Sequence, residues 1–300
     1  MTVSLVTGGA GFIGSNIVSM LLELGHEVRV IDDESSDSHD HFYWQENSKN
    51  YIYNICDYAH IRSIFDGVDY VFHLAAESRI QPTIENPIKA TMTNTFGTNV
   101  VLQCSREAGV KRVIYSSTSA AYGLNELPNV ETQLDDPLNP YSVSKVNGEK
   151  LCKMYTDLFG LPTIIFRYFN VYGSNQPVRG QYAPVIGIFG RQKQNKEPLT
   201  IVGDGEQRRD FVSVIDVANA NIAAALNDID EKNFGTVFNI GSGVNYSIND
   251  IASMFDSETV NIPERTGEMK ETLADITKAK KELNWEPSIN LDTWLHKHRY

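Results

Sequence analysis

The chain alternates short apolar runs with longer amphipathic segments, and no other feature restricts its fold as strongly. The runs VSLVTGG, VRVIDD, YVFHLAA, RVIYSST and TIIFRYFNV are separated by segments of helical pattern such as NIVSMLLELG and VNGEKLCKMYTDLFG. Strands that alternate with helices form βαβ units, whose parallel strands are covered by helices on both faces. We therefore predict an α/β fold with a doubly wound parallel sheet.

The alternation is regular over residues 1–170 and looser afterwards. Loops rich in Gly, Pro, Gln and Asn follow, and two later runs near 211–241, FVSVIDVANANIAAAL and TVFNIGS, are suited to return to the sheet. We expect 1–170 and these return segments to form the first domain. Residues 171–300 are expected to form mainly a smaller, interleaved α/β substrate lobe. A content of 41% hydrophobic residues in a chain of 300 supports a normal buried core.

A glycine-rich turn follows the first strand-like run, in TGGAGFIGSN, where Gly8, Gly11 and Gly14 are spaced three apart. Glycines let the backbone turn tightly and approach a ligand, while the following helix offers unpaired N–H groups to a pyrophosphate. An ordinary strand-to-helix turn is the alternative. Asp32, at the end of the second run, is placed to accept hydrogen bonds from ribose hydroxyls and would repel a 2′-phosphate. The pattern predicts a Rossmann-type domain that binds NAD rather than NADP.

The stretch NPYSVSKVNGEK places Tyr141 and Lys145 four residues apart at the start of an expected helix. Residues at this spacing lie on one helix face, and a nearby cation favours the phenolate form of tyrosine. The alternative is an exposed pair without function. Three hydroxyl side chains, Ser116, Ser117 and Thr118, end the run just upstream, at the edge where parallel strands face a ligand. We predict that hydroxyl, tyrosine and ammonium groups meet beside the nicotinamide.

The composition argues against several classes of partner. The formal net charge is −12 and the chain has no lysine- or arginine-rich run, so nucleic-acid binding is not expected. No apolar stretch approaches the ~18 residues that span a bilayer, and no membrane partner is expected. Cys56, Cys104 and Cys152 are odd in number and lack metal-ligand spacing, which predicts a cytoplasmic protein. Short histidine pairs within 39–41 and 296–298 lack further ligands, so no metal site is expected.

Eight motifs together resemble one family along nearly the whole chain. They are, in order, TGGAGFIGSN, FHLAAE, NTFGT, YSSTSAAYG, NPYSVSKVNGE, RYFNVYG, GDGEQRRDFV and NIGSG. The sequence resembles the extended short-chain dehydrogenase/reductases, and specifically their nucleotide-sugar epimerases and dehydratases. The resemblance implies that Tyr141 is the catalytic base. It also implies that Lys145 lowers the pKa of Tyr141 and binds the nicotinamide ribose, while Thr118 contacts the reacting sugar oxygen.

The resemblance also implies the residues that bind NAD. Asn54 stands where the family usually has an aspartate facing the adenine, Asn94 would support the cofactor loop, and Tyr168 would pack at the nicotinamide. His73 is interpreted as a buried strand residue without a catalytic role. The implied cofactor residues are Gly8, Gly11, Phe12, Ile13, Gly14, Asp32, Asn54, Ile55, Leu74, Ala75, Ala76, Asn94, Ser116, Tyr141, Lys145 and Tyr168.

Two arginines match those that hold the substrate diphosphate in the family, Arg209 and Arg265, although a surface salt bridge is the alternative for each. Asn170 would contact the same group. Thr272 matches a gatekeeper beside C2 of the sugar, where threonine leaves room for an acetamido group and a bulky aromatic would not. The implied substrate residues are Ser117, Thr118, Asn170, Arg209, Arg265 and Thr272.

The reaction expected from the resemblance is epimerisation. The dehydratases carry an Asp–Glu pair after the catalytic threonine, whereas Ser119 and Ala120 stand here. We expect a NAD-dependent 4-epimerase of UDP-N-acetylglucosamine and UDP-N-acetylgalactosamine, with unacetylated sugars or uronates as further substrates. A decarboxylase, dehydratase or reductase of the same family and a non-catalytic NAD-binding protein remain alternatives. Apolar positions on the helices expected at 94–109 and 142–159 predict a homodimer.

Overall fold

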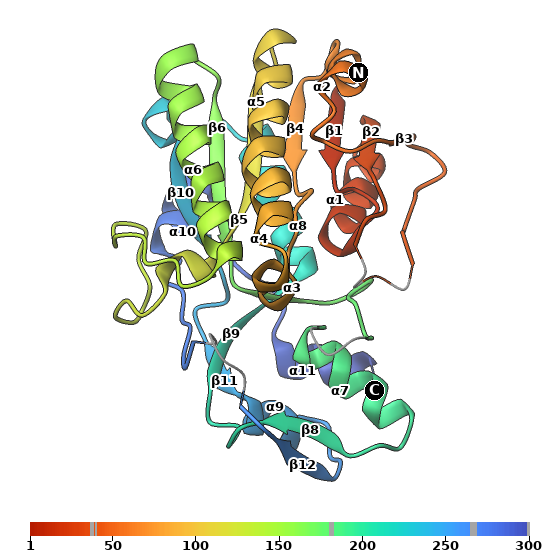
Figure 1. Cartoon of the computed structure of the whole chain (residues 1–300), viewed down its shortest axis with the longest axis vertical. Coiled ribbons are helices and arrows are strands. Elements are labelled where there is room, and N and C mark those ends of the chain that lie inside the picture. Colours follow the sequence, from red (N-terminus) through yellow and green to blue (C-terminus); the bar gives the residue numbers. More distant parts are fainter. Residues whose placement is uncertain (37–38, 40, 180–182, 265–268, 299–300) are drawn as a thin grey trace.

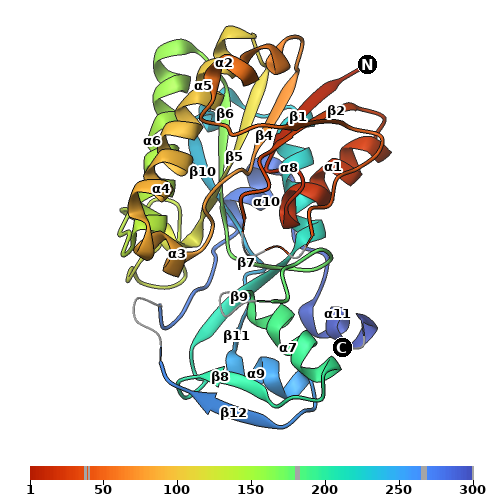
Figure 2. The ribbon, with the colours of Figure 1, turned by 45° about the vertical axis from the view of Figure 1, so that its right-hand side comes forward.

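The computed structural model describes residues 1–36, 39, 41–179, 183–264 and 269–298. A large sheet between two layers of helices forms one part of the molecule, and a smaller lobe lies beyond the carboxyl ends of its strands (Figures 1 and 2). This arrangement confirms the predicted doubly wound α/β fold. The large sheet contains seven strands in the order β10-β6-β5-β4-β1-β2-β3. They are β1 (Val3–Thr7), β2 (Glu27–Asp32), β3 (Lys49–Ile52), β4 (Tyr70–His73), β5 (Arg112–Thr118), β6 (Thr163–Tyr168) and β10 (Thr236–Ile240).

All neighbouring strands of the large sheet are parallel, and β1 is the point where the strand order reverses. Thr7, the last residue of β1, is in register with Ile31 of β2 on one side and His73 of β4 on the other. The chain proceeds outward from β1 to β3 and then returns to start the other half at β4. Connections diverge at such a switch point and leave a crevice for a ligand.

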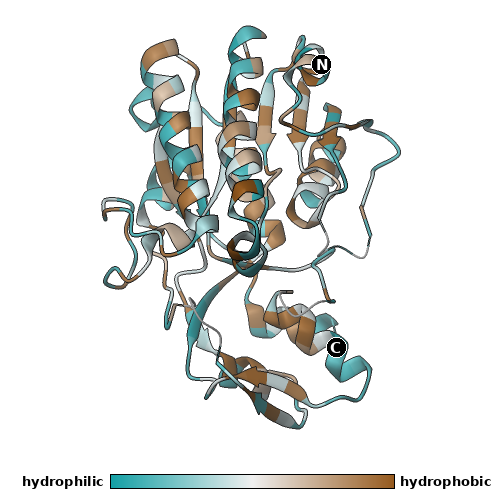
Figure 3. Ribbon diagram, viewed as in Figure 1, coloured by the Kyte–Doolittle hydropathy of each residue, from teal (hydrophilic) through white to brown (hydrophobic). Residues whose placement is uncertain are grey.

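Two layers of helices bury the two faces of the sheet. The strand alternation decides which layer each side chain meets: Ile114 of β5 packs into one core cluster, whereas Val113 and Tyr115 pack into the other. On the first face lie α1 (Phe12–Glu23), α8 (Val214–Leu226) and α10 (Thr277–Leu283); on the second lie α2 (Tyr58–Ile61), α5 (Thr98–Glu107) and α6 (Pro140–Phe159). Figure 3 shows the resulting concentration of hydrophobic residues in the sheet strands.

The smaller lobe has its own core and two small sheets. Its core contains Tyr172, Phe189, Phe255 and Trp294, all largely buried. Its strands are β7 (Asn170–Tyr172), β8 (Leu199–Val202), β9 (Arg208–Ser213), β11 (Asn245–Ser247) and β12 (Thr259–Ile262), and its helices are α7 (Val185–Gln194), α9 (Ile248–Met254) and α11 (Leu291–His298).

The chain passes between the two parts more than once. Helix α8 and strand β10, both within the region expected to return, join the large sheet, and so does α10, which the sequence analysis did not include. The domain boundary placed at residue 170 stays a prediction. The remaining helical segments are α3 (Ile80–Glu85), α4 (Pro87–Thr91), a π-helical stretch (Met92–Gly97) and short 3-10 turns at Arg62–Phe65, Ser119–Tyr122 and Glu231–Asn233. Among the described residues, none of the helices has the length and apolar character needed to span a membrane.

Candidate active site

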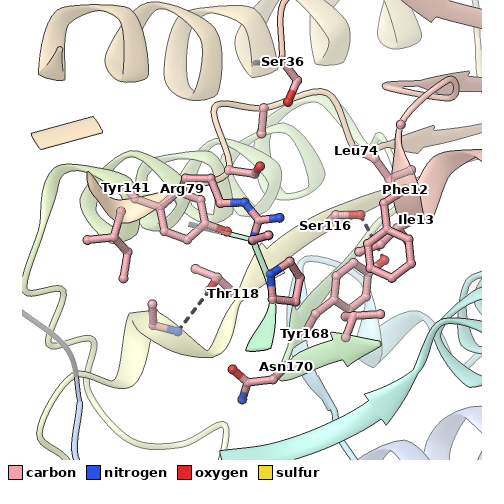
Figure 4. Close-up of a pocket in the computed structure, with 18 of the residues that line it drawn as sticks. Phe12, Ile13, Ser36, Leu74, Arg79, Ser116, Thr118, Tyr141, Tyr168 and Asn170 are labelled. Atoms are coloured by element: carbon pink, nitrogen blue, oxygen red, sulfur yellow. Dashed lines mark hydrogen bonds between the residues drawn. The ribbon is translucent and has the colours of Figure 1, made fainter. Parts of the chain in front are cut away.

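A cavity lies between the carboxyl ends of the large sheet and the smaller lobe, and both parts line it. Figure 4 shows Thr118 and Tyr141 facing this space. The predicted site residues that line it are Gly8, Gly11, Phe12, Ile13, Gly14, Asp32, Ile55, Leu74, Ala75, Ala76, Ser116, Ser117, Thr118, Tyr141, Lys145, Tyr168, Asn170, Arg209 and Thr272. Asn54 and Asn94 are not part of the lining, and Arg265 lies outside the described residues. The fold thus gathers residues from separate stretches of the sequence that run from Gly8 to Thr272.

The glycine turn between β1 and α1 has the backbone geometry that a dinucleotide requires. Gly8 has a φ of +69°, and a Cβ there would lie 2.6 Å from the backbone nitrogen of Ala75. A Cβ on Gly14 would lie 2.1 Å from the carbonyl oxygen of Gly8. The N-cap of α1 is Gly11, which has no side chain to cap the first N–H groups of the helix, and these groups follow the turn directly. These residues fit a bound pyrophosphate, because side chains would block both the turn and the close approach of the ligand.

Asp32 ends β2 beside this turn and is 9% exposed. One carboxylate oxygen accepts the N–H of Ala10 at 3.1 Å and the other accepts the N–H of Glu34 at 3.0 Å. Burial raises the pKa of Asp32, and these two hydrogen bonds act against that rise. The carboxylate is therefore held in place at the edge of the cavity, as expected for a group that binds ribose hydroxyls.

Asn54 contributes to the same end of the cavity indirectly. Its side chain is exposed, its amide nitrogen donates to Asp33 at 2.7 Å, and its amide oxygen accepts the N–H of Cys56 at 2.8 Å. Asp33 itself lines the cavity. Asn54 is thus linked to a residue of the cavity lining, and its contact with the adenine stays a prediction.

Tyr141 lies in the first turn of α6, and local sequence determines where that turn begins. The N-cap residue Asn139 accepts the N–H of Ser142, whose hydroxyl in turn contacts the N–H of Asn139, and Pro140 occupies the first helical position. This reciprocal cap fixes the start of the helix at the mouth of the cavity. The tyrosine is thereby presented to the ends of β5 and β6.

Three influences act on the pKa of Tyr141. Burial raises this pKa, while a hydrogen bond from Thr118 and the positive charge of Arg79 favour the phenolate. Thr118 Oγ1 accepts the N–H of Ala120 at 3.1 Å, so its own proton is free to be donated into the cavity. The hydroxyl–tyrosine pair expected from the sequence is therefore present in the structure.

Lys145 lies one turn further along α6 and is buried. Its ammonium lies 4.3 Å from the ring centroid of Tyr115, and burial lowers its pKa to about 7. The cation that acts on Tyr141 is Arg79, which the sequence analysis did not identify. The sequence signal by which it could have been found is its position in the loop directly after β4, at the switch point of the sheet. The lowering of the Tyr141 pKa by Lys145 stays a prediction.

The hydroxyls that end β5 point alternately to the two faces of the sheet. Ser116 contacts the hydroxyl of Tyr168 at 3.0 Å, and that hydroxyl also accepts the amide of Asn221 at 2.8 Å. Ser117 lines the cavity, but its hydroxyl donates to Glu149 on α6. Ser117 therefore belongs to a buried polar network as well as to the cavity, and its predicted contact with the sugar stays a prediction.

Two buried polar side chains form hydrogen bonds close to the end of β4. Asn94 accepts the N–H of Glu77 at 2.8 Å and donates to the carbonyl of Glu77 and the hydroxyl of Ser144. These hydrogen bonds connect Asn94 to the loop, and its support of a bound cofactor stays a prediction. His73 contacts threonine hydroxyls through both ring nitrogens, and burial lowers its pKa to about 3. It is neutral and structural, which confirms the interpretation from the sequence.

The smaller lobe supplies the other end of the cavity. Arg209 is held by hydrogen bonds from its guanidinium to two backbone carbonyls, at 2.9 and 3.2 Å. Asn170 donates to the carbonyl of Asp210 at 2.9 Å, and Thr272 accepts the N–H of Asp210 at 3.2 Å. Strands β7 and β9 and the segment around Thr272 are therefore tied together at the position expected for the substrate.

Comparison with known proteins agrees with this geometry. Residues 4–241 match the model of the NAD dependent epimerase/dehydratase family. A putative UDP-glucose 4-epimerase of Methanocaldococcus jannaschii is 37% identical, over 96% of this chain and 94% of that protein. A UDP-glucuronate 4-epimerase of Thermodesulfobacterium geofontis is 34% identical, over 97% of this chain and 93% of that protein.

The similarity extends to solved structures. The crystal structure of the UDP-glucose 4-epimerase of Thermotoga maritima with UDP-glucose superimposes with a TM-score of 0.91, at 35% identity and with 100% of both chains covered. The family match spans the glycine turn, Thr118, Tyr141, Lys145 and Arg209. On the evidence of its fold, its cavity and these similarities, the chain belongs to the NAD dependent epimerase/dehydratase family, and NAD is its cofactor.

Proposed function

We propose that the chain is an epimerase that inverts C4 of a UDP-hexose through a transient 4-keto sugar. The observation that carries the proposal is the meeting of Thr118 and Tyr141 in a cavity that joins the glycine turn to Arg209 on the smaller lobe. The names of similar proteins, which include UDP-glucose 4-epimerases, support the same reaction. UDP would be held by Arg209 and Asn170, and the sugar would lie beside Tyr141.

In the proposed reaction NAD supplies a hydride acceptor that later returns the hydride, so the cycle has no net redox change. Tyr141 takes the proton from the C4 hydroxyl during oxidation and gives it back during reduction. Thr118 donates its single hydroxyl proton to the same sugar oxygen, which holds that oxygen within reach of Tyr141. The keto sugar turns over between the two steps and presents its opposite face to the same residues.

The charges in the cavity favour epimerisation over elimination. Elimination of water needs a carboxyl acid and base near the sugar. Among the described residues that line the cavity, the carboxylates are Asp32 and Asp33, which lie beside the glycine turn rather than beside Tyr141. Ser119 and Ala120, which follow Thr118, carry no carboxyl group. The alternative is a decarboxylase or reductase of the same family, and product analysis would distinguish either of them from an epimerase.

We further propose that the sugar carries an acetamido group at C2, as in UDP-N-acetylglucosamine and UDP-N-acetylgalactosamine. Thr272 lines the cavity beside Asn170, to which it is linked by a contact of 3.4 Å. Its small side chain supports this assignment because a bulky aromatic residue at this position would fill the space needed by the acetamido group. UDP-glucose and UDP-galactose would fit the same space.

A homodimer in the cytoplasm is part of the proposal. Several apolar side chains are exposed along neighbouring helical segments: Ile88 of α4 is 76% exposed, and Phe96, Val143 and Leu158 are also exposed. A symmetric partner that packs on α4, α5 and α6 would bury them. Cys56, Cys104 and Cys152 are free thiols, as is usual in a reducing compartment. Sedimentation at micromolar concentration that shows monomers only would rule out the dimer.

The test is incubation of the purified protein with NAD and a panel of UDP-sugars, followed by separation of the C4 epimers. We expect a product of unchanged mass and no net formation of NADH. Tyr141→Phe is the matched control, because it removes one oxygen from the reacting position. Formation of a lighter product, net NADH release, or turnover by the Phe variant at the wild-type rate would refute the proposed reaction.

A further inference from the structure

Arg79 is a cation in the middle of the proposed sugar site, and the reaction proposed above gives it no role. It is the residue before α3, in the loop that follows β4, and it lines the cavity. Figure 4 shows its guanidinium beside the hydroxyl of Tyr141. Within the part of the chain that the structure describes, the buried Nε of Arg79 has no hydrogen-bond partner.

Among the described residues, no carboxylate acts as a counter-charge to Arg79. The titratable group that acts on Arg79 is Tyr141, and burial lowers the pKa of the guanidinium. The carboxylates among the described lining residues are Asp32 and Asp33, beside the glycine turn. Burying a cation without an anion is unfavourable, and a fold retains such an arrangement most readily when a ligand supplies the anion. The structure thus indicates an anionic group on the ligand at this point.

The position of Tyr141 limits which anionic group this is. If Tyr141 contacts the oxygen on C4, as the proposed function requires, a cation beside it lies next to the substituents of the neighbouring ring carbons. One neighbour is C5, which carries C6. A carboxylate at C6 presents two coplanar oxygens, and guanidinium matches that shape with paired N–H donors. The phosphate groups already have other partners, the glycine turn for NAD and Arg209 for the substrate.

We propose that Arg79 is a specificity-determining residue that binds a carboxylate at C6, so that the site takes UDP-hexuronates in preference to UDP-hexoses. This inference rests on the proposed function, because it places C4 of the sugar at Tyr141. Together with the space beside Thr272, it identifies the acetamido hexuronates as the sugars that use every feature of the site. The UDP-glucuronate 4-epimerase similar to this chain is named for a hexuronate, which carries the C6 carboxylate but no acetamido group.

The first test measures binding. Dissociation constants of UDP-glucuronate and UDP-glucose are determined by calorimetry on the NAD-loaded protein, for the wild type, Arg79→Met and Arg79→Lys. We expect the wild type to bind UDP-glucuronate more tightly than UDP-glucose. In Arg79→Met the ratio of the two dissociation constants should fall by about 10- to 100-fold, because a hydrogen bond to a charged group contributes about that much to affinity. Arg79→Lys keeps the charge without the paired donors and should lie between them. Arg62→Met, an exposed arginine outside the cavity, should change neither constant.

Two binding results would overturn the assignment. An equal loss for both sugars in Arg79→Met would show that Arg79 contacts the diphosphate of either substrate or cofactor. A wild type without preference for UDP-glucuronate would show that no carboxylate is bound there. Circular dichroism of each variant establishes that it is folded before the constants are compared.

The second test measures kcat/KM for the same two sugars as a function of pH. If Arg79 only favoured the phenolate of Tyr141, Arg79→Met would shift both pH profiles equally and leave their ratio unchanged, which would contradict the proposal. If the protein epimerises UDP-glucose and Arg79→Met leaves the ratio of the two kcat/KM values unchanged, the proposed function stands and the proposed role of Arg79 is refuted. If UDP-glucuronate binds in an Arg79-dependent manner but no sugar is epimerised, the proposed function is refuted and the role of Arg79 in binding stands.

Discussion

A buried ion network lies beneath the active site. Arg167 of β6 is 2% exposed and donates to both carboxylate oxygens of Glu149 at 2.9 and 2.6 Å, and to Asp135 at 2.5 Å. Burial by itself would lower the pKa of Arg167, but these partners outweigh it and raise the pKa. Glu149 also accepts the hydroxyl of Ser117, at the end of β5. The network therefore ties β5 and β6 to α6, the three elements that carry the reacting groups.

We expect Arg167→Met to lower the free energy of unfolding by about 3–5 kcal/mol. The methionine nearly fills the space of the arginine, but it leaves the carboxylate of Glu149 buried at 4% exposure without its cation. For a chain of 300 residues the entropy of unfolding is ~0.6 kcal/mol/K, so the midpoint of thermal unfolding should fall by ~5–8 °C. Calorimetry and urea denaturation in the absence of ligand measure both quantities.

Two further variants decide whether the loss comes from the unpaired charge. Glu149→Leu combined with Arg167→Met removes both charges, and the double variant should be more stable than the sum of the single losses by ~2–3 kcal/mol. Lys150→Met removes an exposed partner of the same Asp135 and should change the stability by less than ~1 kcal/mol. A loss below ~1 kcal/mol in Arg167→Met, or strictly additive losses in the double variant, would refute the reasoning.

Further predictions concern the reaction and its ligands. Tyr141→Phe should lower kcat by ~10²–10⁴-fold and leave the affinity for NAD within a few fold, measured by turnover and by fluorescence titration. Gly14→Ala should weaken NAD binding at least ~10-fold because its Cβ would overlap the carbonyl of Gly8, 2.1 Å away, whereas Ser19→Ala on the same helix should not; equal affinities would contradict this. Thr272→Tyr should reduce kcat/KM for UDP-N-acetylglucosamine and spare UDP-glucose, and parallel losses would exclude the size argument. The pKa of Lys145 is about 7 in the folded protein and near 10.5 when unfolded, so the unfolded state binds the extra proton between these values. Without NAD, the stability of the wild type relative to Lys145→Met should therefore rise as pH increases from 7 to 10, by at most ~1.4 kcal/mol per unit, and a flat difference in urea denaturation would argue against it.

The sequence alone determined the parts of the protein that depend on local pattern. Alternating apolar runs indicated the parallel sheet because strand and helix periods are set by neighbouring residues. The spacing of Gly8, Gly11 and Gly14 indicated the dinucleotide turn, since only the backbone of that short segment must adopt it. Tyr141 and Lys145 were also indicated by a local pattern. They lie one turn apart because both belong to a single helix that begins after the N-cap residue Asn139.

Only the tertiary structure decided the contacts between distant segments. Arg79 and Tyr141 meet because the loop after β4 and the start of α6 pack together at the carboxyl edge of the sheet. Ser117 faces Glu149 because the pleat of β5 directs it to the α6 side, and a shift of one residue would have sent it to the opposite face. Thr272 joins Asn170 across 102 positions of the chain. Such pairings follow from strand order and from the packing of whole layers, which no short stretch of sequence specifies.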